Sequence, residues 1–194
     1  MNIGIFIYDK AEVLDFSGPF EVFSTASRIC AGAADFKVFL VGETGREVEA
    51  RHGYRVVPSF GFQDHPDIDI LIVPGGLHTA EMEKPQVIDW IARTAKKARL
   101  VASVCTGVFL LARAAVVTNE RVTTHWEDID DLCAAFPQLT VLRDTRFVDE
   151  GSLVTSAGIS AGIDMSLYLV GRLLDLEAAR KTARQMEYDW VEPA

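Results

Sequence analysis

Residues 100–111 read LVASVCTGVFLL, and this stretch decides the fold. The run Leu100–Val104 is apolar, contains β-branched residues and has the length of a strand, so it predicts a short buried strand. From Thr106 onward the apolar residues recur at helical spacing. Cys105 is therefore expected at the junction where a central strand turns into a helix.

Three physical consequences follow from this placement of Cys105. Open α/β folds bind ligands at the carboxyl edge of the sheet, where a side chain at this junction projects. The helix N-terminus offers unpaired N–H groups and partial positive charge, which favour a thiolate over a thiol. The small neighbours Ser103, Thr106 and Gly107 leave room for the sharp turn that presents a nucleophile in hydrolases. We therefore predict a reactive Cys105, the alternative being a buried structural cysteine.

Strands and helices are predicted to alternate along the rest of the chain. The expected strands are Asn2–Tyr8, Phe36–Gly42, Asp69–Val73, Leu100–Val104, Arg121–Trp126, Val141–Leu142, Phe147–Asp149 and Leu153–Thr155, with a small β-hairpin at Glu47–Ala50 and Tyr54–Val57. The expected helices begin near Pro19, Pro85 and Thr106 and cover Trp126–Phe136, Ile163–Leu174 and Glu177–Trp190. This alternation predicts an α/β fold in which a mostly parallel sheet is covered on both faces by helices.

Two further segments are expected to reach Cys105 at the carboxyl edge of the sheet. Asp15 lies just past the first strand between large apolar residues, and a carboxylate in such surroundings tends toward a raised pKa, so it can hold or donate a proton. The alternative for Asp15 is a helix N-cap. Gly75 and Gly76 close another strand and allow backbone N–H groups to approach a bound atom, as an oxyanion hole requires. The alternative for this pair is an ordinary turn.

His125 closes a predicted strand and either activates the thiol or is a structural histidine. The other histidines, His52, His65 and His78, are scattered in predicted loops, and none shares metal-ligand spacing with a cysteine. The sequence also lacks the glycine-rich patterns that bind nucleotides. We therefore predict neither a metal nor a cofactor.

Composition places the chain among ordinary globular proteins. Its 194 residues, 49% apolar and 24% charged, predict one domain over residues 1–194. The net charge of −9 argues against nucleic acid and anionic membranes as partners and leaves a small-molecule substrate. Three cysteines do not make a disulfide framework, and Cys30 and Cys133 are predicted to be structural. With no apolar run of membrane-spanning length and no export signal, a cytoplasmic protein is expected.

Five motifs together resemble the ThiJ/PfpI superfamily, which is related to the class I glutamine amidotransferases. They are LDFSGP at Leu14–Pro19, IVPGG at Ile72–Gly76, SVCTG at Ser103–Gly107, TTHW at Thr123–Trp126 and TSAGISAGID at Thr155–Asp164. Within the superfamily the resemblance is greatest to the isonitrile hydratase branch. It implies a flavodoxin-like, three-layer α/β/α sandwich with a nucleophile elbow, and a homodimer with the active site near the interface.

The resemblance also implies roles for single residues. Cys105 would be the nucleophile, Asp15 its acidic partner, and Thr106 a neighbour that positions or activates the site. Gly75 and Gly76 would supply backbone donors to the pocket. The intracellular-protease branch has a histidine directly after the cysteine, so Thr106 argues against that activity.

Three functional hypotheses remain open at this stage. The first is a cysteine-dependent hydratase, a hydro-lyase type of enzyme that converts isonitriles to N-substituted formamides through a thioimidate on Cys105. The second is a glyoxalase or deglycase acting on methylglyoxal-type aldehydes, in which His125 moves protons. The third is a non-enzymatic sensor in which Cys105 is oxidised.

Overall fold

A six-stranded sheet forms the centre of the computed structural model, which describes residues 1–30, 32 and 35–192. The strands in spatial order are β2 (Lys37–Val41), β1 (Asn2–Phe6), β5 (Ile70–Val73), β6 (Leu100–Val104), β10 (Leu153–Ser156) and β9 (Phe147–Asp149). All neighbours pair in parallel except β9, which runs antiparallel to β10 at one edge. The predicted mostly parallel sheet is confirmed.

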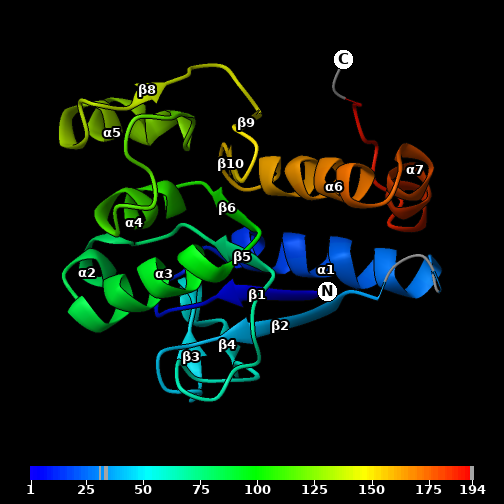
Figure 1. Ribbon diagram of the computed structural model, residues 1–194, viewed down its shortest axis with the longest axis horizontal. Helices are drawn as coiled ribbons and strands as arrows, with labels where there is room; N and C mark the ends of the chain where they lie inside the picture. Colours follow the sequence, from blue (N-terminus) through cyan, green and yellow to red (C-terminus); the bar gives the residue numbers. More distant parts are fainter. Residues whose placement is uncertain (31, 33–34, 193–194) are drawn as a thin grey trace.

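Helices cover both faces of the sheet and make a three-layer α/β/α sandwich (Figure 1). The helices on one face, which pack against one another, are α1 (Val13–Ile29), α6 (Ala161–Leu173) and α7 (Leu176–Gln185). The helices on the other face are α2 (Thr79–Met82), α3 (Pro85–Lys97) and α4 (Gly107–Arg113). None of the described helices is both long and apolar enough to cross a membrane.

Smaller elements lie outside the main sheet. The predicted hairpin is present as β3 (Val48–Glu49) and β4 (Arg55–Val56), joined by a 3-10 turn, η1 (Arg51–Gly53). The elements that follow α4 are β7 (Arg121–Val122), η2 (Trp126–Asp128), α5 (Ile129–Ala135) and β8 (Thr140–Val141). Strands β7 and β8 pair only with each other, so the strand predicted at residues 121–126 is shorter and peripheral.

The ends of two helices differ from the prediction. Helix α1 begins at Val13, which places Pro19 inside the helix and leaves the Asp15 carbonyl without its usual partner four residues later. Burial of side chains such as Phe16 and Phe23 on this helix outweighs that loss. Helix α7 ends at Gln185 because Glu187 adopts a left-handed conformation with φ of 51°.

The parallel register brings two strand ends together at one edge of the sheet. Strand β5 pairs with β6 so that Val73 lies beside Ser103, and both strands are buried along their whole length. The segments that follow them, beginning at Pro74 and Cys105, therefore leave the sheet side by side. The Tyr8 hydroxyl, just beyond β1, donates a hydrogen bond to the Pro74 carbonyl at 3.3 Å.

Two glycines of α6 provide a matched test of this packing. A methyl group at Gly162 would lie 2.8 Å from Cγ1 of Val104, a buried and stiff side chain at the end of β6. At Gly171 the nearest atom would be 3.5 Å away, which is ordinary contact. We expect Gly162→Ala to lower the free energy of unfolding by about 1–3 kcal/mol through overpacking, and Gly171→Ala to raise it by about 0.5–1 kcal/mol through helix propensity. Urea denaturation measures both, and equal effects would contradict the packing described here.

Candidate active site

Cys105 occupies the turn between β6 and α4 in a conformation that is rare for a residue with a side chain. Its φ is 56°, in the left-handed region. The surrounding chain fixes this conformation: the Cys105 N–H donates to the Ser156 carbonyl at 3.1 Å, and the Thr124 hydroxyl donates to the Cys105 carbonyl at 2.9 Å. Strained backbone that neighbouring bonds hold in place is typical of functional sites. The predicted nucleophile elbow is present.

The turn after β5 packs directly against this elbow. A methyl group at Gly75 would lie 2.5 Å from the Thr106 nitrogen and 2.9 Å from the Cβ of Cys105. Only glycine allows so close an approach of backbone to backbone. The glycine pair therefore has a steric role that the sequence analysis did not assign to it.

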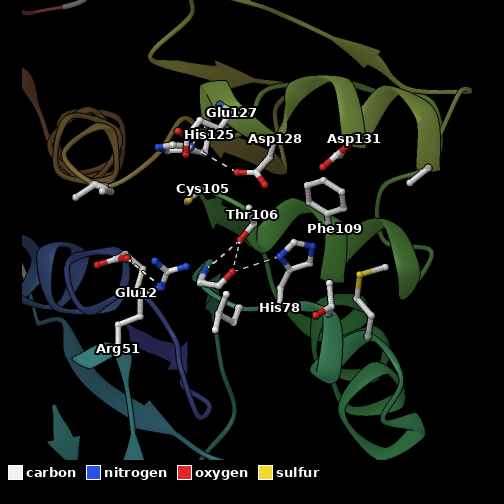
Figure 2. Close-up of a pocket in the computed structure, with 16 residues that line it drawn as sticks. Glu12, Arg51, His78, Cys105, Thr106, Phe109, His125, Glu127, Asp128 and Asp131 are labelled. Carbon is white, nitrogen blue, oxygen red and sulfur yellow. Dashed lines mark hydrogen bonds and ion pairs between the residues drawn. The ribbon is translucent and has the colours of Figure 1, made fainter. Parts of the chain in front are cut away.

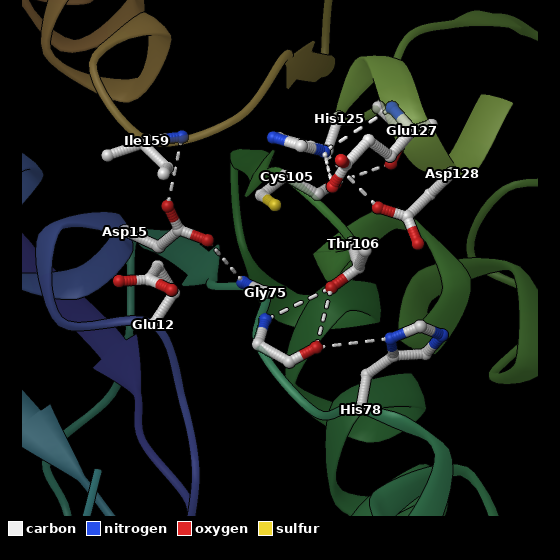
Figure 3. Close-up of polar contacts among 12 residues, drawn as sticks. Glu12, Asp15, Gly75, His78, Cys105, Thr106, His125, Glu127, Asp128 and Ile159 are labelled. Carbon is white, nitrogen blue, oxygen red and sulfur yellow. Dashed lines mark hydrogen bonds and ion pairs between the residues drawn. The ribbon is translucent and has the colours of Figure 1, made fainter. Parts of the chain in front are cut away.

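The N–H groups of this turn are directed at side chains of the site. The Gly75 N–H donates to Oδ2 of Asp15 at 3.1 Å, and the Gly76 N–H donates to Oγ1 of Thr106 at 3.0 Å (Figure 3). The Thr106 hydroxyl in turn donates to the Gly76 carbonyl at 3.1 Å. The pair thus supplies backbone donors to the cysteine pocket, but these donors hold Asp15 and Thr106 and do not form a vacant oxyanion hole.

Asp15 is fully buried in the first turn of α1, beside the elbow. Its Oδ1 accepts the N–H of Ile159 at 3.1 Å while Oδ2 accepts that of Gly75, so the alternative role as a helix N-cap is wrong. Burial, followed by the nearby charge of Glu12, raises the pKa of Asp15 to about 7. Hydrogen bonds from Gly75, the Cys105 thiol and Ile159 oppose this increase.

The Cys105 thiol is only 7% exposed and faces Asp15. Burial, and then the negative charge of Asp15, raise the pKa of the thiol, and only the hydrogen bond from the Thr106 N–H at the start of α4 lowers it. The expectation that the helix N-terminus makes Cys105 a thiolate is therefore wrong for this state. The Cys105 thiol hydrogen-bonds the Asp15 carboxyl group, and the protonated form of the thiol is favoured in this state.

His125 lies on the wall of the same pocket. Its Nδ1 is 3.5 Å from Oδ2 of Asp128 and 3.7 Å from Oε2 of Glu127. Its ring packs against Gly158, where a methyl group would lie 2.1 Å from the imidazole. Among the described residues, no hydrogen bond joins His125 to Cys105, so the histidine is a pocket residue and not the direct partner of the thiol.

The pocket at Cys105 has a volume of about 630 Å³ (Figure 2). Its lining residues are Glu12, Arg51, Gly76, Leu77, His78, Thr79, Met82, Cys105, Thr106, Phe109, His125, Glu127, Asp128, Asp131, Ala135 and Ile159. Within the described ranges, no group of three His, Cys, Asp or Glu side chains is placed to hold a metal ion. Cys133, which was predicted to be structural, is exposed on α5 and lies outside this pocket.

Several lining residues were not found by sequence reasoning. Glu12 lies one helical turn before Asp15, a spacing that could have indicated it. No sequence signal indicated Arg51, because only the fold brings it to the pocket. Its backbone N–H donates to the Ala11 carbonyl at 3.0 Å, and its side-chain Nε lies 3.5 Å from Oε2 of Glu12. His78 packs its ring 4.5 Å from that of Phe109, and burial lowers its pKa.

Comparison with protein families and curated proteins gives a consistent result. The model of the DJ-1/PfpI family matches residues 1–172. The isonitrile hydratase of Pseudomonas putida is 35% identical over 191 residues, which cover 97% of this chain and 78% of that protein. The HTH-type transcriptional regulator GbdR of Pseudomonas aeruginosa is 27% identical over 98% of this chain, and the chain spans about half (51%) of its length. The glutathione-independent glyoxalase DJR-1.2 of Caenorhabditis elegans is 26% identical over 79% of this chain and 81% of that protein.

Solved structures show the same fold. A ThiJ/PfpI family protein from Pseudomonas syringae superposes with a TM-score of 0.87 and 27% identity over 100% of this chain and 77% of that one. DJ-1beta of Drosophila melanogaster superposes with a TM-score of 0.81 and 20% identity over 97% of this chain and 98% of that one, a likeness of fold alone. The predicted flavodoxin-like sandwich is confirmed.

The buried carboxyl of Asp15 predicts an unusual dependence of stability on pH. The native state keeps this proton up to about pH 7, whereas an unfolded aspartate loses it near 3.8, so raising the pH between these values favours unfolding. We expect this group to lower the free energy of unfolding by about 2–4 kcal/mol between pH 4 and 8. Asp15→Asn should lack that contribution, and Asp130→Asn, which removes an exposed carboxylate, should retain it. Urea denaturation across this pH range measures the difference, and parallel curves for wild type and Asp15→Asn would contradict it.

Proposed function

The chain belongs to the DJ-1/PfpI family, and from this premise we propose that it is a cysteine-dependent hydratase that converts isonitriles to N-substituted formamides. One observation carries the proposal. The Cys105 thiol hydrogen-bonds the buried Asp15 and lines a pocket of about 630 Å³, so a thiol and a proton acceptor meet at one point. Similarity to the isonitrile hydratase of Pseudomonas putida supports this choice of electrophile.

The first step is addition across the terminal carbon of the isonitrile. Asp15 accepts the thiol proton, and the Cys105 sulfur forms a bond to the carbon of R–N≡C. Asp15 then delivers the proton to the same carbon, which gives the thioimidate R–N=CH–S–Cys105. A carboxylate with a pKa near 7 suits this double role, because general acid–base catalysis is most efficient when the pKa lies near the working pH.

The second step adds water and releases the enzyme. Asp15 accepts a proton from water as the water oxygen bonds to the thioimidate carbon. Asp15 then passes that proton to the nitrogen, which gives R–NH–CH(OH)–S–Cys105. Collapse of this intermediate breaks the C–S bond, yields the formamide R–NH–CHO and returns the proton to sulfur. The overall reaction consumes one water and needs no oxidant or metal.

Thr106 acts in this mechanism as a positioning residue. Its hydroxyl both donates to and accepts from the backbone of Gly76, which fixes the β5 turn against the elbow. Its N–H hydrogen-bonds the Cys105 sulfur and lowers the pKa of the thiol, in opposition to burial and to Asp15. The side chain therefore fixes the turn while the backbone stabilises the thiolate as it forms.

Substitution of the cysteine and the aspartate tests the mechanism directly. We expect Cys105→Ser to reduce hydration of an aryl isonitrile by roughly 10³-fold or more, and Asp15→Asn to reduce it by about 10²–10⁴-fold. Cys133→Ser removes an exposed thiol outside the pocket and should leave turnover unchanged. Absorbance or chromatography of the formamide gives the rates. Full activity of the Cys105→Ser variant would contradict the covalent mechanism.

The pH profile tests the role of Asp15 as the initial proton acceptor. Because Asp15 must be ionised to take the thiol proton, kcat/KM should rise with pH through an apparent pKa of about 7. The charge of Glu12 contributes to that pKa, so Glu12→Gln should move the rise to lower pH. Stopped assays over pH 5–9 measure both profiles. A rise that stays at the same pH in Glu12→Gln would contradict this electrostatic assignment.

The presence of His125 in the pocket favours glyoxalase chemistry as a second candidate. In that reaction Cys105 attacks an aldehyde such as methylglyoxal and His125 moves the proton, and similarity to the glyoxalase of Caenorhabditis elegans supports it. Loss of methylglyoxal turnover in His125→Ala, with no isonitrile turnover in wild type, would favour this candidate. If neither substrate is consumed, a ligand- or redox-sensing role becomes the better hypothesis.

A further inference from the structure

Charged groups are unevenly distributed around the pocket. In Figure 2, Glu12 and Arg51 lie to one side of Cys105, and Asp128 and Asp131 lie to the other. Among the described residues of the lining, Arg51 carries the one guanidinium or ammonium group. Its Nε is 3.5 Å from Oε2 of Glu12. The positive charge on the first side is therefore already balanced by a carboxylate.

The second side carries negative charge with little to offset it. Within the described part of the chain, Asp131 forms no ion pair, and the basic partner of Asp128 is His125 at 3.5 Å. Nδ1 of His125 also lies 3.7 Å from Oε2 of Glu127, so one imidazole lies near two carboxylates. His78, on the same wall, has its pKa lowered by burial. The wall keeps a net negative charge even when His125 is protonated.

This wall lies in the same pocket as Cys105, the one thiol among the described lining residues. Cys105 is 7% exposed, so a molecule that reaches its sulfur must enter the pocket that Asp128 and Asp131 line. Carboxylates at the entrance to a partly enclosed cavity attract cations and repel anions, and solvent ions screen the effect. The Cys105 sulfur and the carboxylates of Asp128 and Asp131 therefore belong to different parts of one pocket.

We propose that the pocket takes electrophiles that carry a protonated amine, with the reactive carbon at Cys105 and the ammonium group at Asp128 and Asp131. This inference rests on the proposed function for the identity of the electrophile, an amine-bearing isonitrile. The charge preference itself is a property of the pocket. It can be measured without any turnover.

Charged thiol reagents test the charge preference. In the reaction of a methanethiosulfonate, the Cys105 sulfur forms a disulfide with the reagent and methanesulfinate leaves. The rates of the 2-aminoethyl and 2-sulfonatoethyl reagents are measured on a Cys30→Ser/Cys133→Ser background by mass spectrometry of the Cys105 peptide. Each rate is divided by that of the same reagent with a small free thiol. We expect the cationic reagent to be favoured by about tenfold or more at low salt, and the ratio to fall as salt is added.

Two variants, one that removes carboxylates of the pocket lining and one that removes a carboxylate outside it, identify the residues responsible. Asp128→Asn combined with Asp131→Asn should reduce the preference by about tenfold. Asp130→Asn makes a single charge change in the same first turn of α5, but Asp130 pairs with Arg143 and lies outside the pocket lining, so it should preserve the preference. A wild-type ratio near one, or an equal loss in Asp130→Asn and in the double variant, would overturn the proposal.

A substrate series separates this inference from the proposed function. We expect kcat/KM for an aminoalkyl isonitrile to exceed that for an isocyanocarboxylate by about tenfold or more, and the double variant to remove the difference. Turnover of both substrates with equal kcat/KM would overturn the charge preference and leave the hydratase intact. Labelling that prefers the cation, together with no turnover of any isonitrile, would overturn the hydratase and leave the charge preference intact.

Discussion

The site depends on the burial of one carboxylate. Asp15 is fully buried, and moving a carboxylate out of water is costly unless hydrogen bonds replace the lost hydration. Its two oxygens accept N–H groups from Gly75 and Ile159, which are 60 and 144 residues away in the sequence. Helix α1, the turn after β5 and the loop after β10 are thereby tied to one another around the elbow.

The two N–H donors compensate the carboxylate only in part, and this partial compensation determines how the cysteine is activated. With full compensation Asp15 would remain a carboxylate at all ordinary pH values, and its charge would hold the thiol in its protonated form. With a pKa near 7, Asp15 is a stronger base than an ordinary aspartate, and this lowers the cost of taking the thiol proton. A helix N-terminus alone would favour a permanent thiolate, but burial of Cys105 and the charge of Asp15 outweigh it. In the proposed mechanism the thiol is therefore activated by proton transfer to Asp15 and not by a permanent charge on the sulfur.

The parts of this arrangement that sequence could predict are those that depend on local pattern. Strand β6 and the position of Cys105 follow from an apolar run that ends where helical spacing begins, and the order of strands and helices then places Asp15 at the same edge of the sheet. Pro19 shows where local rules fail. A proline usually lies in the first turn of a helix, but α1 begins six residues earlier, at Val13, because its buried side chains stabilise the longer helix. Arg51 shows a different failure, since only the folded hairpin brings it beside Glu12. The pKa of the Cys105 thiol likewise could not be predicted. It depends on burial and on distances to Asp15 and to the N-terminus of α4, which no local sequence pattern contains.

Cys105 and Asp15 come from a different part of the chain than the wall of the pocket that carries Asp128 and Asp131. The elbow and Asp15 are built from the central strands and α1, and such a pair can add to an isonitrile, an aldehyde or an oxidant with little change in geometry. The wall comes from the peripheral segment of residues 121–141, which contains η2 and α5 and pairs its strands apart from the main sheet. Thr124 of that segment donates to the Cys105 carbonyl, and Leu132 is buried in the core. Asp128 and Asp131 instead line the pocket, so their charges can vary without loss of the elbow. In the proposed function, the choice of substrate therefore depends more on the charged residues of η2 and α5 that line the pocket than on the cysteine itself.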